Sequence, residues 1–75
     1  MVKPTRITNE IRALRFAAGE MTQAELADRI GVTRQTVIAI EQGRYSPSLE
    51  VAFRIARVFE VGLEDVFRHP AEESM

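Results

Sequence analysis

The 75-residue sequence contains no cysteine, and its only histidine is His69, beside Pro70 near the C-terminus. Without cysteine the chain can form no disulfide, no zinc site with sulfur ligands and no thiol nucleophile, and a reducing cytoplasm is its natural setting. Catalysis needs a perturbed base or nucleophile in a concave pocket. Because the carboxylates are spread as surface helix residues and His69 is expected to be inert, we expect no enzyme, no metal site and no cofactor.

Long apolar runs are also lacking. No stretch approaches the roughly 18 to 20 residues of a membrane span. The segment Lys3-Pro4-Thr5-Arg6 leads into an amphipathic stretch, whereas a signal peptide would continue into an apolar one. We therefore expect no contact with a membrane.

The residues that are present have an ordinary globular composition, 45% hydrophobic and 28% charged. A chain of this length makes one domain with one small core. Its net charge of −1 hides a split: residues 1–44 hold seven Lys and Arg against five acids, a net of +2, whereas residues 45–75 hold three against six, a net of −3. Such a split fits a molecule that turns one face toward an anion. Ordinary scatter of surface charge fits it equally.

Capping residues divide the chain into short helices. Thr8, Thr22, Thr33 and Ser48 stand where a hydroxyl can cap a helix, and a glycine or Pro47 separates the apolar segments. The predicted helices cover about residues 9–18, 23–30, 34–42, 49–59 and 63–67. Strand signals are absent. We predict an all-α fold of five short helices in a compact bundle, in which the second and third form a helix-turn-helix.

The apolar spacing predicts a flexible arm at 1–8, one domain at 9–68 and a disordered tail at 69–75. In the first helix Ile11 and Leu14 point inward, extended by Phe16 or by Ala17 and Ala18. The second helix is apolar at Ala24, Leu26, Ala27 and Ile30. In the fourth helix the predicted apolar face consists of Leu49, Ala52, Phe53, Ile55, Ala56 and Phe59. We expect Phe53, Phe59 and Phe67 to be core residues.

The most informative segment joins the second and third helices at Gly31-Val32. Two short helices joined by so tight a turn cross steeply, so one flank of the second member stays outside the core. Val37 and Ile40 then point inward, and the outer flank carries Arg34, Gln35, Ile38 and Ala39.

These outer side chains match the edges of bases in the major groove of DNA. Arg34 can donate two hydrogen bonds to guanine, Gln35 can pair with adenine, and Ile38 or Ala39 can meet a thymine methyl. A merely solvated helix face is the alternative for Arg34 and Gln35. Ile38 either touches DNA or is covered by the arm of residues 1–7.

Other residues suit the phosphate backbone. Gln23 lies in the first turn of its helix, where free N–H groups favour an anion, and Thr33 lies at the start of the next. Gln42, Gly43 and Arg44 leave the third helix in a loop. Tyr45 can pack on that loop, bind a phosphate or contact a second copy. Lys3 and Arg6 belong to an arm that either enters a minor groove or is a disordered leader.

The stretch from Ile11 to Phe67 resembles the Cro- and Xre-like helix-turn-helix proteins, the phage-repressor type. The resemblance rests on "LR" at 14–15, "MTQAELADRIGVTRQTV" at 21–37, "IEQGRYSPSL" at 40–49 and "VGLEDVF" at 61–67, about three quarters of the chain. It implies that Gln23 and Arg44 contact phosphates, and that Arg34, Gln35 and Ala39 face bases. It also implies a buried ion pair between Arg15 and Glu41.

The chain departs from this family pattern in two places. The segment 19–23 has one residue more than in many relatives, and Ile38 and Ala39 stand where relatives often have polar residues. Base recognition would then use fewer hydrogen bonds and more methyl contacts.

We expect a regulator, associated with the bacterial or phage nucleoid, that binds a palindromic double-stranded operator as a homodimer, with half-sites about 34 Å apart. The expected dimer patch consists of Val51, Val58, Leu63 and Phe67. No small-molecule ligand is expected. The alternative is an antitoxin-like or coactivator-like module that binds mainly another protein.

Overall fold

The computed structural model describes residues 5–44 and 46–70. Within them lie five helices, in agreement with the prediction, although most end earlier than expected. They are α1 (Ile11–Ala17), α2 (Gln23–Ile30), α3 (Arg34–Glu41), α4 (Leu49–Val58) and α5 (Leu63–Val66). Residues 1–4 of the predicted arm and 71–75 of the predicted tail lie outside the described residues, and the division into arm, domain and tail stays a prediction.

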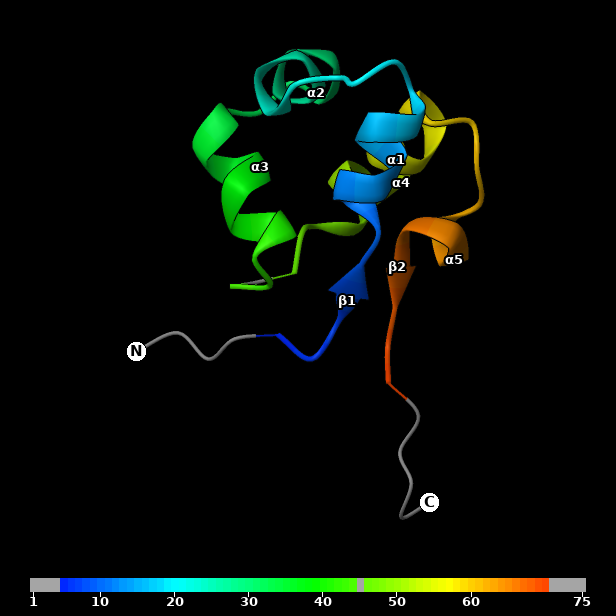
Figure 1. Cartoon of the computed structure of the whole chain (residues 1–75). Helices are drawn as coiled ribbons and strands as arrows, with labels where there is room; N and C mark the ends of the chain where they lie inside the picture. Colours follow the sequence, from blue (N-terminus) through cyan, green and yellow to red (C-terminus); the bar gives the residue numbers. More distant parts are fainter. Residues whose placement is uncertain (1–4, 45, 71–75) are drawn as a thin grey trace.

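The expected absence of strands is wrong. Two short strands, β1 (Thr8–Asn9) and β2 (Phe67–Arg68), pair antiparallel and join the two ends of the described chain (Figure 1). Strands of two residues are too short to show the alternating pattern by which strands are recognised in a sequence. Their pairing depends on how the helices bring the ends together.

The first helix begins later than predicted, and Thr8 does not cap it. Thr8 lies in β1, where its hydroxyl donates to the carbonyl oxygen of Arg68 at 3.4 Å. The Oδ1 atom of Asn9 instead accepts a hydrogen bond from the backbone N–H of Ile11 at 3.1 Å. Asn9 also donates through Nδ2 to the carbonyl oxygen of Ile40 at 3.0 Å, which ties the start of α1 to the end of α3.

One apolar core lies between the helices. Its buried members are Ile11, Met21, Leu26, Ala27, Ile30, Val37, Ile40, Ala52, Ile55, Ala56 and Val66. Phe59 and Phe67 are half-buried and pack against this core.

Several apolar residues that were predicted to point inward lie at the surface. Phe16 and Phe53 are each 52% exposed and Leu49 is 72% exposed, and Ala24 is exposed too. In α4 the buried residues are Ala52, Ile55 and Ala56, and Leu49 and Phe53 lie outside this stripe. A run of apolar residues does not by itself show which of its members faces the core.

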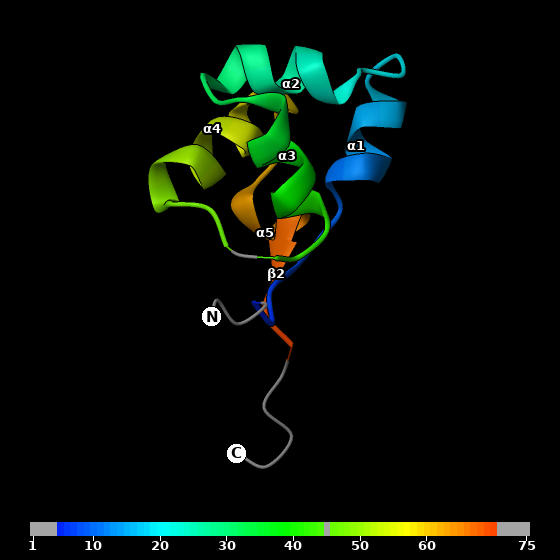
Figure 2. The same ribbon diagram turned by 90° about the vertical axis from the view of Figure 1, so that its left-hand side faces the viewer.

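Helix α3 lies at one edge of the molecule, opposite α5 and β2 (Figure 1). Viewed from that side, α3 stands in front of α5 and β2, and α2 runs across its upper end (Figure 2). The fold therefore presents one flank of α3 to the outside.

None of the helices in residues 5–44 and 46–70 is long and apolar enough to cross a membrane.

Candidate DNA interface

The turn between α2 and α3 is built from local capping. Gly31 has φ +75°, in the left-handed region that glycine tolerates best, and the N–H of Val32 donates to the carbonyl oxygen of Ala27 at 3.0 Å. Thr33 then caps α3, because its Oγ1 accepts from the N–H of Thr36 at 3.2 Å. These contacts fix the direction in which α3 leaves α2.

The two flanks of α3 differ as the sequence indicates. Val37 and Ile40 are buried, whereas Arg34 and Gln35 are exposed and make no hydrogen bond or ion pair with any residue in the described ranges. Ile38 and Ala39, which were also expected on the outer flank, are half-buried. The free donors and acceptors of α3 thus point away from the core.

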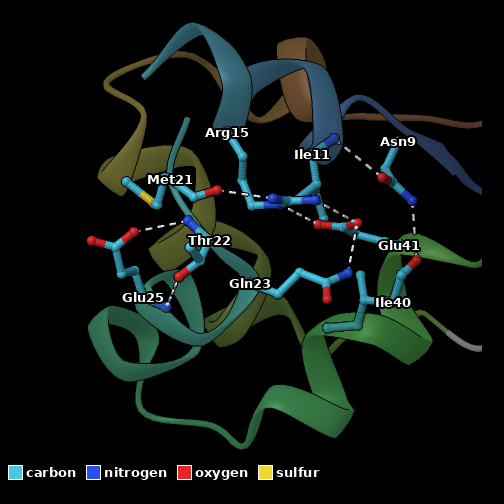
Figure 3. Close-up of polar contacts among 9 residues, drawn as sticks. All are labelled: Asn9, Ile11, Arg15, Met21, Thr22, Gln23, Glu25, Ile40 and Glu41. Atoms are coloured by element: carbon cyan, nitrogen blue, oxygen red, sulfur yellow. Dashed lines mark hydrogen bonds and ion pairs between the residues drawn. The ribbon is translucent and has the colours of Figure 1, made fainter. Parts of the chain in front are cut away.

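A polar network fixes α3 to α1 and α2. The Nε of Arg15 donates to Oε2 of Glu41 at 2.7 Å, and its Nη2 donates to Oε1 at 3.2 Å. The side chains of Arg15 and Glu41 are only 8% and 10% exposed, so the expected buried ion pair is present. Gln23 donates through Nε2 to Oε1 of the same carboxylate at 3.2 Å. Figure 3 shows Arg15 and Gln23 converging on Glu41 from α1 and α2.

The additional residue between α1 and α2 is accommodated without loss of this network. Gly19 and Glu20 both adopt positive φ, at +80° and +58°, which folds the chain back on itself. Met21 is then held by Arg15 twice: its N–H donates to the Arg15 carbonyl oxygen at 2.9 Å, and its own carbonyl oxygen accepts from Nη1 at 2.8 Å.

The N-terminus of α2 carries a complete capping box. The N–H of Thr22 donates to Oε1 of Glu25 at 2.8 Å, and the N–H of Glu25 donates to Oγ1 of Thr22 at 3.0 Å. The hydrogen bonds from the Thr22 backbone and then from its side chain hold the pKa of Glu25 below its usual value.

An open groove of about 640 Å³ runs between α1, the start of α2 and α3. Apart from Phe16 and Ala24 its lining is polar: Asn9, Arg12, Arg15, Thr22, Gln23, Arg34, Glu41 and Gln42. The groove adjoins the outer flank of α3 at Arg34, so the two features form one surface.

A helix-turn-helix family model matches residues 11–66, which include all five helices. The chain belongs to the helix-turn-helix family. The resemblance to its phage-repressor type is confirmed, since a similar protein is the cryptic phage CTXphi transcriptional repressor RstR of Vibrio cholerae, 34% identical over 59 residues. That match covers 79% of this chain and 52% of the repressor.

Other helix-turn-helix relatives match over most of their own length. An uncharacterized regulator of Methanocaldococcus jannaschii is 51% identical over 57 residues, covering 76% of this chain and 86% of the relative. The regulator YgzD of Bacillus subtilis, also uncharacterized, is 48% identical over 59 residues, covering 79% and 88%. All are named as transcriptional regulators, in agreement with the expectation that the chain is not an enzyme.

The fold also matches a crystal structure. A Bacteroides fragilis protein superposes with a TM-score of 0.71 at 21% sequence identity, covering 83% of this chain and 98% of that protein. At this identity the match supports the helix-turn-helix fold alone.

The structure brings the predicted DNA-contacting residues of this helix-turn-helix onto neighbouring surfaces. Thr33, Gln42 and Arg44 are exposed at the two ends of α3. Tyr45 lies outside the described residues. Gln23 was predicted from sequence as a phosphate contact, but one of its amide protons is already donated to Glu41.

Arg12 and Phe16 line the groove beside α3, but neither was predicted from sequence as a site residue. The spacing of Arg12 could have indicated its place, because it lies three residues before Arg15 and therefore on the same side of α1.

Proposed function

We propose that this protein is a sequence-specific regulator that inserts α3 into the major groove of double-stranded DNA. The observation that supports this most is the outer flank of α3, where Arg34 and Gln35 are exposed and unpaired among the described residues. Side chains that hydrogen-bond base edges must have free donors and acceptors before they meet DNA. A helix held rigidly by its inner flank meets this requirement without refolding.

Base recognition in this proposal comes from four residues. Arg34 donates two hydrogen bonds to guanine, and Gln35 pairs with adenine. Ile38 and Ala39 keep part of their surface uncovered, which suits contact with thymine methyl groups. The alternative that the arm covers Ile38 depends in part on residues 1–4, outside the described ranges, whereas Ile7 lines a separate groove with Leu63 and Phe67.

Backbone contacts in this proposal surround α3. Thr33 at its start, with Gln42 and Arg44 at its end, would fix the register on DNA without reading sequence. Gln23 keeps one amide proton for a phosphate while the other binds Glu41, so it would couple the position of α3 to the DNA backbone. Tyr45 is proposed as a further phosphate contact.

We further propose that two copies bind a palindromic operator, since one module makes few contacts. Of the predicted dimer patch, Val51, Val58 and Phe67 are half-buried and pack against the core of their own chain. Leu49 and Phe53 are far more exposed. The proposed dimer surface is therefore centred on Leu49, Phe53 and Leu63, which line two adjoining grooves.

The test is to select, from a pool of random duplex DNA, the sequences that the purified protein binds. The Arg34→Ala, Gln35→Ala double variant is run in parallel. We expect the wild type to enrich a palindrome with half-sites about one helical turn apart. Each single substitution should cost about 1–3 kcal/mol on the selected site and relax the preference at its own position.

The matched control is Arg44→Ala, which should weaken binding to all sequences alike. If neither the wild type nor the variants enrich any sequence, α3 does not read DNA by itself, and an antitoxin-like or coactivator-like role becomes the hypothesis to pursue.

A further inference from the structure

The groove between α1 and α3 holds two arginines without an acidic partner. Arg15 is committed to Glu41, but Arg12 and Arg34 make no hydrogen bond or ion pair with any residue in 5–44 or 46–70. Both are exposed. Two unpaired guanidinium groups that line one groove give the groove an excess of positive charge.

The single carboxylate in the groove does not supply this charge. Glu41 accepts from Nε and Nη2 of Arg15 and from Nε2 of Gln23, so three N–H groups surround its two oxygens. An anion that approaches Arg12 or Arg34 therefore meets a carboxylate that is already neutralised. With three arginines against one glutamate in its lining, the groove has a formal charge of +2.

Phe16 holds Arg12 at the edge of this groove. The Cζ atom of Arg12 lies 5.5 Å from the centroid of the Phe16 ring, within the range of a cation–π contact. A ring of this size that is 52% exposed contributes little to the core. Its contact limits the rotamers of Arg12 and keeps the guanidinium near the groove without using any of its N–H donors.

We infer that Arg12 contacts a DNA phosphate, and that α1 thereby adds to the DNA interface a residue that the helix-turn-helix unit lacks. This rests on the proposed function, because Arg34 at the opposite side of the groove is the residue placed at the base edges. With α3 in the major groove, the groove beside it faces one strand of the backbone. Guanidinium groups bind phosphate oxygens through paired N–H donors, so Arg12 suits this position.

The experiment measures binding of the full chain to a fluorescein-labelled duplex of fixed arbitrary sequence by fluorescence anisotropy, over roughly 50 to 200 mM salt. One phosphate contact contributes about 0.9 to the slope of log K against log salt. We expect Arg12→Ala to weaken binding about five- to tenfold near 0.1 M salt and to make this slope shallower by about one.

Arg68→Ala is the matched control, because it removes the same charge from an exposed position on β2, away from α3. Circular dichroism establishes that both variants keep their helices. If Arg12→Ala and Arg68→Ala reduce affinity and slope equally, the effect is net charge and the assignment of Arg12 is overturned.

Two further measurements separate this inference from the proposed function. If the wild type binds no duplex, the proposed function itself fails; if it binds and Arg34→Ala weakens it while Arg12→Ala does not, only the assignment of Arg12 fails. The second measurement is a titration with inorganic phosphate at matched ionic strength. Saturable binding of that ion, lost in Arg12→Ala, would assign the groove to a free anion and overturn the contact with DNA.

Discussion

Helices α3 and α4 are built by the same rules and differ in the flank that they leave uncovered. Each begins behind a hydroxyl that accepts a backbone N–H three residues on, from Thr33 in α3 and from Ser48 in α4. Each buries one apolar stripe. The uncovered flank of α3 presents Arg34 and Gln35, whereas α4 exposes two large apolar side chains, Leu49 and Phe53, beside charged ones.

Different parts of these helices build the fold and select a partner. Caps and buried stripes place both helices in the bundle and say nothing about what they bind. The remaining flank decides that, because hydrogen-bonding side chains match base edges and apolar side chains match another apolar surface. We accordingly propose DNA as the partner of α3 and a second copy of the chain as the partner of α4.

The two helices also differ in their ion pairs, and this difference gives the largest expected effect. Glu41→Ala removes the carboxylate from Arg15, leaving a buried guanidinium without its charge partner. We expect the free energy of unfolding to fall by about 3–5 kcal/mol, a large part of the stability of a domain of this size. Urea unfolding followed by circular dichroism measures it.

The matched control is Glu50→Ala in α4. The pair between Glu50 and Arg54 joins side chains that are 76% and 49% exposed, so its loss should cost no more than about 0.5 kcal/mol. Equal losses in the two variants would contradict the view that the network at the end of α3 supports the helix proposed to face DNA.

The second prediction concerns the apolar flank of α4. Changing Leu49 and Phe53 to serine removes two exposed apolar side chains one helical turn apart. The proposed dimer should weaken by about 2–4 kcal/mol, since both side chains are exposed in the monomer and would be buried in each of the two subunits. Sedimentation equilibrium over a range of protein concentrations measures the dimer. The monomer's unfolding should change little, and a dimer of unchanged affinity would place the interface elsewhere.

Much of this fold follows from local sequence signals. Thr22, Thr33 and Ser48 cap the helices that they were predicted to cap, because a cap depends on residues only three positions apart. The flanks of α3 were likewise predictable from Val37 and Ile40, whose spacing fixes the inner side. The ion pair between Arg15 and Glu41 was implied by the family resemblance and not by any local rule.

The features that the sequence did not indicate depend on distant contacts. The strands β1 and β2 pair residues 60 and 58 positions apart (8 with 68, 9 with 67), and neither strand is long enough to carry a pattern. Phe16 was one of two alternatives expected to extend the inward face of the first helix, but its ring is exposed and lies beside Arg12. The bond from Gln23 to Glu41 likewise arises only once α2 and α3 are placed side by side.

The smallest expected effect concerns the helix caps and the dependence of stability on pH. In α2 the third helical residue is Glu25, which bonds back to Thr22, whereas Thr36 and Val51 hold the equivalent places in α3 and α4. Of these three caps, only that of α2 contains a carboxyl group. Because folding lowers the pKa of Glu25, this carboxylate stabilises the fold above its ordinary pKa of 4.5, and the contribution is lost as the pH falls through the lowered value.

Glu25→Gln isolates this contribution, because an amide can still accept the N–H of Thr22 but carries no charge. At neutral pH the variant should unfold at a lower urea concentration than the wild type. The difference should shrink as the pH falls below about 4.5 and disappear below the lowered pKa, where the folded wild-type carboxyl is neutral as well. A difference that stays constant across this range would mean that the cap of α2 acts through its hydrogen bonds alone, as the caps of α3 and α4 do.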